Sequence, residues 1–149
     1  MTATCGARNI DLVKNLGANE VLDYKTPEGD ALKSPSGVKY DAIIHCATGI
    51  PWSKFSSTLT PNGKVIDLTP NFKSIVHTIF KKVTFSKQKL VPFMASPNSE
   101  DLKLLGELVK DGKLRNIVDS QHPFAKAEES WVRSMEGHAT GKVVVTFQE

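Results

Sequence analysis

Several features that define whole classes of protein are missing from this sequence. The chain of 149 residues holds two cysteines, Cys5 and Cys46, which form neither a Cys-x-x-Cys pair nor a metal-ligand cluster. Each is predicted to be a small buried residue in a reducing compartment. The sequence has no run of about 18 apolar residues, so no membrane span is predicted. Residues 1–5 have neither a charged nor an apolar signal region, so no secretory signal is predicted either.

Motifs for hydrolysis, metal binding and phosphate binding are also absent. No serine stands in a Gly-x-Ser-x-Gly context, so a serine hydrolase is unsupported. His77, His122 and His138 are far apart in sequence, and no metal site is predicted. Without a Gly-x-Gly-x-x-Gly motif, the chain lacks the pyrophosphate cradle of a complete dinucleotide fold.

The charge of the chain does not favour binding to a polyanion. Nineteen Lys and Arg residues against 16 Asp and Glu give a net charge of +3. The basic residues are spread along the chain, and the densest group, at residues 81–89, is interleaved with apolar side chains. Nucleic-acid proteins usually concentrate charge on one face, so no nucleic-acid partner is predicted.

What the chain does contain is a regular alternation of short apolar runs and helical stretches. Strands are predicted at residues 2–5, 21–24, 40–47, 64–69, 89–95, 115–119 and 142–147. Helices are predicted around residues 10–16, 31–32, 52–59, 72–83, 99–110 and 126–135. This alternation is typical of right-handed βαβ units, so the predicted fold class is α/β, a doubly wound, Rossmann-type, mostly parallel sheet.

Individual residues sharpen this prediction. Residues 40–47 form a near-continuous apolar run, typical of a strand buried on both faces, and His45 within it is expected to be a core residue. Pro92 indicates an edge strand or a bulge. Trp52 and Trp131 are expected to pack helices against the sheet.

Ligands of a doubly wound sheet bind beyond the carboxyl ends of its strands, here residues 6–9, 47–49 and 68–70. The first loop carries no Asp or Glu to hold an NAD ribose, and offers Arg8 instead. An arginine there can pair a 2′-phosphate, which favours NADP(H), and Lys14 is a weaker second candidate. The alternative is that Arg8 is a solvated residue of the first helical turn.

Six segments carry a family resemblance in the expected order: Leu16–Ala18, Val21–Tyr24, Tyr40–Ile44, Leu59–Ile66, Leu108–Leu114 and Gly141–Val145. Together they resemble the second half of the cofactor domain in zinc-independent quinone oxidoreductases of the medium-chain dehydrogenase/reductase superfamily. Cys5–Asn9 and His45–Trp52 are most similar to the plant chloroplast-envelope members.

The resemblance implies an NADPH-dependent oxidoreductase that transfers hydride to a small-molecule enone or quinone, with no metal and with no catalytic residue assignable from this chain. It also implies a full-length parent that is a homodimer, a chloroplast-envelope location and peripheral membrane association; composition alone indicates a soluble intracellular protein. The implied cofactor-binding residues are Gly6, Arg8, Lys14, Tyr24, Ala47, Thr48, Leu68, Thr69, Phe93, Met94, Thr140, Gly141 and Lys142.

The sequence departs from the family pattern at its start. Family members carry a GroES-like catalytic domain and a first βα unit with the glycine-rich loop before this region. Residues 1–149 are therefore predicted to be a partial NADP-binding Rossmann domain, whether a fragment, a truncated gene model or a splice form. Loss of the first strand would leave a gap beside residues 40–47.

Two functional hypotheses follow from this departure. In the first, the full-length parent is the enzyme and this fragment alone is inactive. In the second, the chain is a non-catalytic nucleotide-binding or self-associating module, with residues 89–95 as a candidate dimer strand.

Overall fold

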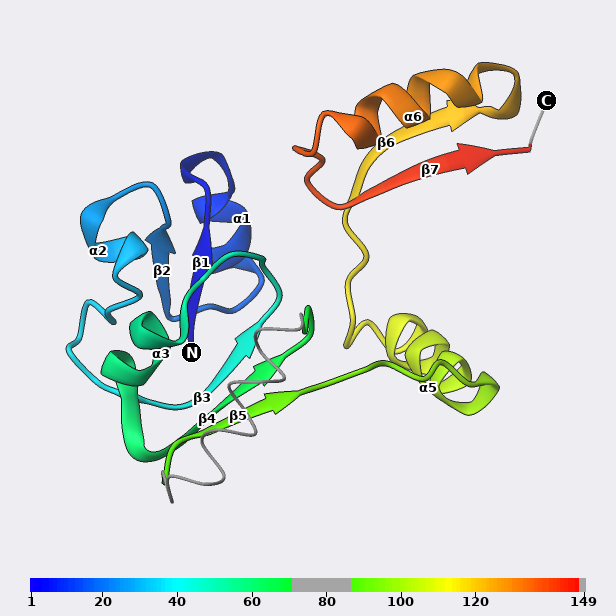
Figure 1. The fold of residues 1–149 in the computed structure, drawn as a ribbon. Coiled ribbons are helices and arrows are strands. Elements are labelled where there is room, and N and C mark those ends of the chain that lie inside the picture. Colours follow the sequence, from blue (N-terminus) through cyan, green and yellow to red (C-terminus); the bar gives the residue numbers. More distant parts are fainter. Residues whose placement is uncertain (71–86, 148–149) are drawn as a thin grey trace. The chain divides into compact units, whose positions relative to one another are not determined.

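A computed structural model describes residues 1–70 and 87–147, so the helix predicted at residues 72–83 lies outside the described residues. The chain divides into two compact units, Met1–Ala95 and Ser96–Glu149. Figure 1 shows their elements in chain order. Every strand pairing in the described part of the chain is parallel, and described helices lie between successive strands from β1 to β4 and from β5 to β7, which confirms the predicted α/β class.

The first unit opens with a parallel strand pair. Strand β1 (Thr2–Cys5) pairs in register with β2 (Glu20–Asp23), and the turn η1 (Ala7–Asn9) and helix α1 (Ile10–Asn15) form the crossover between them. The apolar residues Ala18 and Leu22 are buried beneath this crossover region. The strand, helix and strand predicted from the sequence are confirmed within about one residue, the usual uncertainty of element ends.

The second predicted helix lies earlier than expected. Helix α2 spans Pro27–Asp30, whereas Ala31 is its C-cap and Leu32 has a left-handed φ of 56°. The Thr26 hydroxyl accepts a hydrogen bond from the Gly29 N–H at 3.1 Å. A capping threonine followed by proline starts a helix, so the prediction at residues 31–32 was wrong because it overlooked this start signal.

A three-stranded parallel sheet completes the first unit. Its order is β3 (Tyr40–His45), β4 (Leu59–Asp67) and β5 (Lys89–Pro92), and helix α3 (Trp52–Thr58) connects the first two strands. Strand β4 begins five residues before the strand predicted at residues 64–69, and its register with β3 shifts within this extension, since Tyr40 pairs with Leu59 but Ala42 pairs with Lys64. Among the described strands β5 is an edge strand, as Pro92 predicts.

The core of this unit lies between α3 and one face of the three-stranded sheet. Phe55, Leu59 and Val65 are buried there, with Trp52 packed against them as expected. His45 is buried too, and its ring meets the Phe55 ring edge-on with 4.9 Å between centroids. The prediction that residues 40–47 are buried on both faces was wrong, because Ile44, on the opposite face from His45, is 66% exposed.

The two cysteines are more exposed than predicted. Cys46 follows β3 and is exposed, and Cys5 is only half-buried, so the prediction of two buried cysteines was wrong. In the described part of the chain β1 pairs with β2 and β3 pairs with β4, and no pairing joins β1 to β3. The two described sheets are therefore not joined by hydrogen bonds, in agreement with the gap expected beside residues 40–47.

The second unit contains helix α5 (Ser99–Lys110), strand β6 (Val118–Pro123), turn η2 (Phe124–Lys126), helix α6 (Ala127–Met135) and strand β7 (Lys142–Thr146). Helix α5 is capped by Asn98, whose side-chain oxygen accepts from the Asp101 N–H at 2.8 Å. Strand β6 begins three residues later than predicted, and α6 and β7 lie where they were expected.

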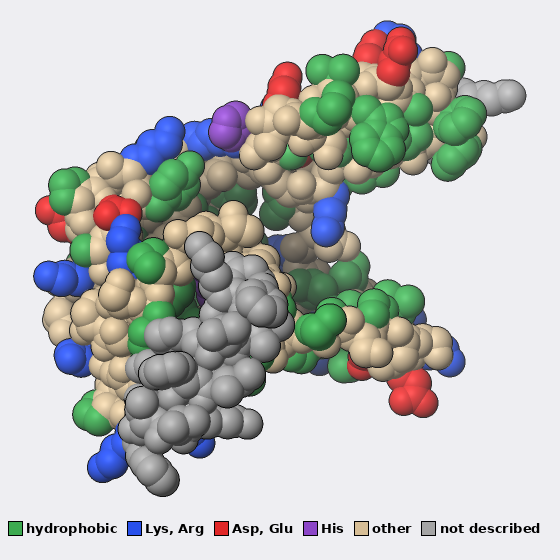
Figure 2. Space-filling view, in the orientation of Figure 1, with side chains coloured by type: hydrophobic (Ala, Val, Ile, Leu, Met, Phe, Trp, Pro, Cys, Tyr) green, Lys and Arg blue, Asp and Glu red, His purple; other side chains and the backbone are tan. Residues whose placement is uncertain are grey.

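Apolar side chains of the second unit are largely exposed. Figure 2 shows hydrophobic side chains gathered on the visible side of the β6–α6–β7 region. Trp131 is 70% exposed, which contradicts its predicted role in helix packing, and the rings of Phe124 and Phe147 stack at 4.9 Å. None of the described helices has the length and apolar character needed to cross a membrane.

Candidate nucleotide-binding edge

The first unit gathers most of the predicted cofactor-binding residues at the carboxyl ends of its strands. Strands β1 to β5 end at Cys5, Asp23, His45, Asp67 and Pro92, and the predicted residues follow directly. The residues in these positions are Gly6, Arg8, Tyr24, Ala47, Thr48, Leu68, Thr69, Phe93 and Met94. Because the strands of each sheet are parallel, residues that follow neighbouring strands lie at one edge of that sheet.

Gly6 and Tyr24 are in contact. The Tyr24 N–H donates to the Cys5 carbonyl oxygen at 3.1 Å, which continues the β1–β2 ladder by one step. A Cβ atom on Gly6 would lie 3.6 Å from both Cε1 and the hydroxyl oxygen of Tyr24, so the ring lies over the glycine backbone. Tyr24 is 51% exposed, which leaves part of its ring accessible at the strand ends.

The Cys5 thiol, one residue before Gly6, is held in its neutral form. Partial burial, and then the nearby Asp23 carboxylate, raise the pKa of Cys5 above its ordinary value. A thiol of this kind is a poor nucleophile at neutral pH, so it is not a candidate catalytic group.

The two basic candidates occupy different positions along the crossover. Arg8 lies in η1, directly after β1, with an exposed side chain. Lys14 lies in the last turn of α1, and a crossover helix runs back toward the amino ends of the strands. Arg8 is therefore the better placed of the two for a ligand at the carboxyl edge.

The loops after β3 and β4 are joined by main-chain and side-chain hydrogen bonds. The Thr69 hydroxyl donates to the Ala47 carbonyl oxygen at 2.7 Å, and the Leu68 N–H donates to the His45 carbonyl oxygen at 2.9 Å. These bonds hold Ala47 beside Leu68 and Thr69, three of the predicted residues, and they fix the shape of the edge between the two strands.

Asp67 is a residue of this edge that sequence reasoning missed. Its side chain is only 2% exposed, and its Oδ1 accepts the Thr69 N–H at 3.0 Å. Its carbonyl oxygen accepts the Phe93 N–H at 2.8 Å, which links the end of β4 to the residue after β5. A carboxylate at the end of an apolar strand, two residues before a threonine, was the available signal, because such a side chain can cap the following turn.

Thr140, Gly141 and Lys142 belong to the second unit, where they form the turn into β7. The Thr140 N–H donates to Asp119 Oδ1 at 2.7 Å, and the Lys142 N–H donates to the Ile117 carbonyl oxygen at 2.8 Å. Gly141 has a φ of 112°, and a Cβ there would lie 2.3 Å from the same Ile117 oxygen, so only glycine fits. Main-chain hydrogen bonds and the close approach to Ile117 therefore account for Thr140, Gly141 and Lys142 within the second unit.

Asp119 is the anchor of that turn. It pairs with Arg133 through two hydrogen bonds of 2.7 Å, from Nε to Oδ2 and from a terminal guanidinium nitrogen to Oδ1. Arg133 also donates to Glu136 Oε2 at 2.7 Å. The bonds to Asp119, and then those to Glu136, raise the pKa of Arg133 above its already high value.

Parallel strands, crossover helices and small or polar residues at the strand ends define an α/β domain of the Rossmann type. The chain belongs to the zinc-binding dehydrogenase family, since the sequence profile of that family matches residues 16–145. It is 58% identical over 145 residues to a chloroplast envelope quinone oxidoreductase homologue of Arabidopsis thaliana, covering 97% of this chain and 44% of the relative.

Two further comparisons extend this result. An NADPH-dependent alkenal/one oxidoreductase of A. thaliana, described as chloroplastic, is 28% identical over 152 residues, or 97% of this chain and 33% of the relative. The solved quinone oxidoreductase of Coxiella burnetii superposes with a TM-score of 0.79 at 22% identity, covering 99% of this chain and 44% of that one, which shows the fold. The chain thus spans less than half the length of these relatives.

The family suggests two ligands, a zinc ion and a dinucleotide, and the residues of this chain fit them to different degrees. In the described part of the chain, no three His, Cys, Asp or Glu side chains come together to hold a metal ion, so the described residues do not fit zinc. For a dinucleotide the fit is partial. The strand ends offer Gly6 and the exposed Arg8, whereas the sequence contains no glycine-rich pyrophosphate loop.

Proposed function

We propose that this chain is the cofactor-domain part of an NADPH-dependent reductase of activated alkenes or quinones. The dinucleotide lies along the carboxyl ends of β1 to β5, and the full-length parent is the active enzyme. The observation that carries the proposal is the gathering of Gly6, Tyr24, Ala47 and Thr69 at these strand ends, in a chain 58% identical to a quinone oxidoreductase homologue.

In this proposal each group at the edge has a limited task. Arg8 pairs the 2′-phosphate of the adenosine ribose, and Tyr24 beside Gly6 covers the neighbouring ribose and phosphate. The Ala47–Thr69 hydrogen bond holds the middle of the groove in shape, and Phe93 and Met94 contribute apolar surface near the nicotinamide. NADPH supplies the hydride, while the protein binds and orients it.

The other implied residues complete the proposal. Lys14 provides longer-range positive charge, and Thr48 and Leu68 line the groove. By resemblance to the family, Thr140, Gly141 and Lys142 also contact the cofactor, and residues 1–149 are a partial NADP-binding domain. No catalytic residue is assigned.

The proposed substrate and location follow the names of the relatives, whereas the proposed assembly and membrane association follow the family resemblance alone. The substrate is a small electrophilic enone or quinone, the protein is located at the chloroplast envelope as a peripheral protein, and the full-length parent is a homodimer. The names of the two A. thaliana relatives support the substrate class and the chloroplast.

Calorimetric titration of the chain with NADPH and with NADH tests the cofactor preference. Wild-type protein is expected to favour NADPH, and Arg8→Ala to weaken NADPH binding by about 10- to 100-fold, the effect of removing a charge-assisted hydrogen bond. Lys110→Ala, an equal change of charge on the exposed side of α5, is the control and keeps the wild-type affinity. Equal NADPH affinity in Arg8→Ala and wild type contradicts the 2′-phosphate role.

One observation favours a second function for the chain by itself. Strands β1 and β3 each have a single hydrogen-bonded neighbour among the described strands, and open strand edges promote association. A non-catalytic nucleotide-binding or self-associating module is therefore the alternative. Because the chain alone is expected to be inactive under either proposal, self-association of the chain in solution, measured by sedimentation, is the outcome that favours the module.

A further inference from the structure

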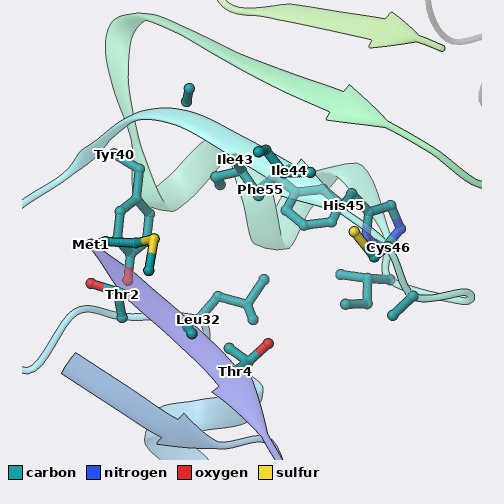
Figure 3. A pocket seen from close by; sticks show the side chains of 14 residues that line it. Met1, Thr2, Thr4, Leu32, Tyr40, Ile43, Ile44, His45, Cys46 and Phe55 are labelled. Carbon is teal, nitrogen blue, oxygen red and sulfur yellow. The ribbon is translucent and has the colours of Figure 1, made fainter. Parts of the chain in front are cut away.

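Asp67, the last residue of β4, carries a carboxylate that lies inside the protein. Val65, two residues earlier on the same strand, packs with Phe55 and Leu59 in the core cluster, so Asp67 points to the same face of the sheet. The register partner of Asp67 on β3 is His45, whose ring lies beside Phe55 (Figure 3). Asp67 is only 2% exposed, so its carboxylate ends the strand within the layer between the sheet and α3.

Hydrogen bonds satisfy this carboxylate only in part. Its Oδ1 accepts the Thr69 N–H at 3.0 Å, and the Thr69 hydroxyl oxygen lies 3.3 Å from the same atom. Among the described residues, these contacts reach Oδ1 and none reaches Oδ2. A buried carboxylate with an unbonded oxygen costs free energy, so an apolar side chain would serve stability better at this position. Because stability does not account for Asp67, its effect on Thr69 is the more direct explanation.

Asp67 and Ala47 together fix both polar groups of Thr69. The hydroxyl has one proton, and the shorter distance, 2.7 Å to the Ala47 carbonyl oxygen against 3.3 Å to Asp67, assigns that proton to Ala47. The N–H of Thr69 is bonded to Asp67 Oδ1. Thr69 is therefore held at two points, one in the loop after β3 and one at the end of β4.

The hydrogen bonds around Thr69 also decide which polar groups are left for a ligand. The Leu68 N–H donates to the His45 carbonyl oxygen at 2.9 Å, and the Phe93 N–H donates to the Asp67 carbonyl oxygen at 2.8 Å. With the N–H and hydroxyl proton of Thr69 also bonded, the oxygen atoms of this loop remain as acceptors. An uncharged group that donates hydrogen bonds, such as the carboxamide of nicotinamide, suits these acceptors better than a phosphate does.

The loops after the first and the later strands differ in charge. Arg8, with an exposed side chain, follows β1, whereas residues 67–70 and 91–94 include no Lys or Arg. A phosphate is therefore favoured beside Arg8 and disfavoured beside Thr69. The nicotinamide half of the dinucleotide is the part whose chemistry fits the loop after β4.

We propose that Asp67 is a positioning residue for the nicotinamide half of NADPH. It acts through Thr69: by bonding the Thr69 N–H, it keeps the loop after β4 in the conformation that offers acceptors to the carboxamide. The inference rests on the proposed function, since it requires NADPH at the carboxyl ends of the strands.

Calorimetric titration with NADPH, and separately with adenosine 2′,5′-bisphosphate, which lacks the nicotinamide half, tests this role. Asp67→Ala is expected to weaken NADPH binding by about tenfold and to leave the affinity for the bisphosphate unchanged. Asp67→Asn keeps an acceptor oxygen for the Thr69 N–H and is expected to bind NADPH within about threefold of wild type. Unchanged NADPH affinity in Asp67→Ala overturns the inference.

Thr58→Ala is the matched control for the loss of a buried polar side chain. Thr58 is 5% exposed, its hydroxyl donates to the Phe55 carbonyl oxygen at 3.0 Å, and it directly precedes the first residue of β4. The control is expected to bind both ligands as wild type does. Equal losses for NADPH and the bisphosphate in Asp67→Ala, or the same NADPH loss in Thr58→Ala, indicate a general effect on folding and overturn the positioning role.

A measurement on the wild-type chain requires no variant to fold. The amide chemical shifts of Thr69 and Phe93 are expected to respond to NADPH and not to the bisphosphate. Equal responses to the two ligands overturn the inference while the proposed function stands. Wild-type protein that binds neither ligand overturns the proposed function and the inference together, so the two failures are distinguishable.

Discussion

The two compact units are stabilised in different ways. All five buried hydrophobic residues of the described chain lie in the first unit, where Phe55, Leu59 and Val65 form a cluster against β3 and β4. In the described part of the second unit, the buried residue is the polar Ser130, while Trp131, Met135 and Phe147 are largely exposed. The second unit is instead stabilised by hydrogen bonds that join Asp119 to Arg133 and to the Thr140 N–H. An apolar core therefore positions the candidate cofactor edge, and polar hydrogen bonds position the turn at residues 140–142.

Removing the centre of the core gives the largest expected effect. Phe55 is 3% exposed, and Phe55→Ala should lower the free energy of unfolding of the first unit by about 3–5 kcal/mol, the usual cost of deleting a buried aromatic side chain. Trp131→Ala, which removes a larger but 70% exposed side chain, should change stability by less than about 0.5 kcal/mol. Urea unfolding monitored by amide exchange measures both. Similar losses in the two variants would contradict the contrast between the units.

Breaking the polar network should loosen the second unit alone. Asp119→Asn keeps the size of the side chain but removes the charge that accepts two hydrogen bonds from Arg133. Faster amide exchange is expected at Thr140 and Lys142, with unchanged exchange at Val65 in the first unit. Glu136→Gln removes only the outer partner of Arg133 and should have a smaller effect in the same direction. Unchanged exchange at Thr140 in Asp119→Asn would contradict the anchoring role.

The first unit has its own polar contact, and that contact predicts a pH dependence. Hydrogen bonds from Ser34, then from Thr2 and Ser36, lower the pKa of Glu20 from 4.5 to about 2. A depressed carboxylate pKa stabilises the folded state above the unfolded-state value, and this stabilisation is lost as the pH falls from about 4.5 to about 2. Glu20→Gln should therefore flatten the stability profile in this window, whereas Glu28→Gln, on the exposed side of α2, should not. Parallel profiles for Glu20→Gln and wild type in urea unfolding would contradict the assignment.

The smallest expected effect concerns the shape of the candidate edge. Thr69→Val removes the hydroxyl that donates to the Ala47 carbonyl oxygen and keeps the side-chain shape. A loss of about 0.5–1.5 kcal/mol in local stability is expected, together with faster exchange at residues 47–49 and 68–69. Thr69→Ser retains the hydroxyl and serves as the matched control. If the valine and serine variants behave alike, the hydrogen bond does not hold the edge.

Local sequence signals predicted most of the fold. The strands at residues 2–5 and 142–147, and the helix around Trp52, could be found because apolar periodicity and turn residues act over short distances. The prediction of two-sided burial for residues 40–47 failed for a non-local reason: burial of Ile44 requires a neighbouring layer, and the apolar run does not reveal whether that layer is present. The sequence likewise does not reveal whether a neighbouring layer covers Cys46 or Trp131.

The candidate site was predictable only in part. The rule that ligands bind beyond strand ends located Gly6, Ala47 and Thr69 correctly at the carboxyl edge. Asp67 was missed, because its importance lies in a hydrogen bond to Thr69 and a main-chain bond to Phe93 that only the folded chain brings together. A gap beside residues 40–47 was expected, but the pocket between β1 and β3, with an uncharged lining drawn partly from Leu32 and Phe55, required the structure.

Amide chemical shifts of the labelled chain during titration with NADPH test the central claim most directly. The account predicts that the shifts concentrate at Gly6, Arg8, Ala47, Thr48 and Thr69, at the carboxyl ends of the strands, and are small at Thr2 and Lys89, the first residues of β1 and β5. Shifts centred on the opposite ends of the strands, or the absence of any shift at saturating NADPH, would contradict it.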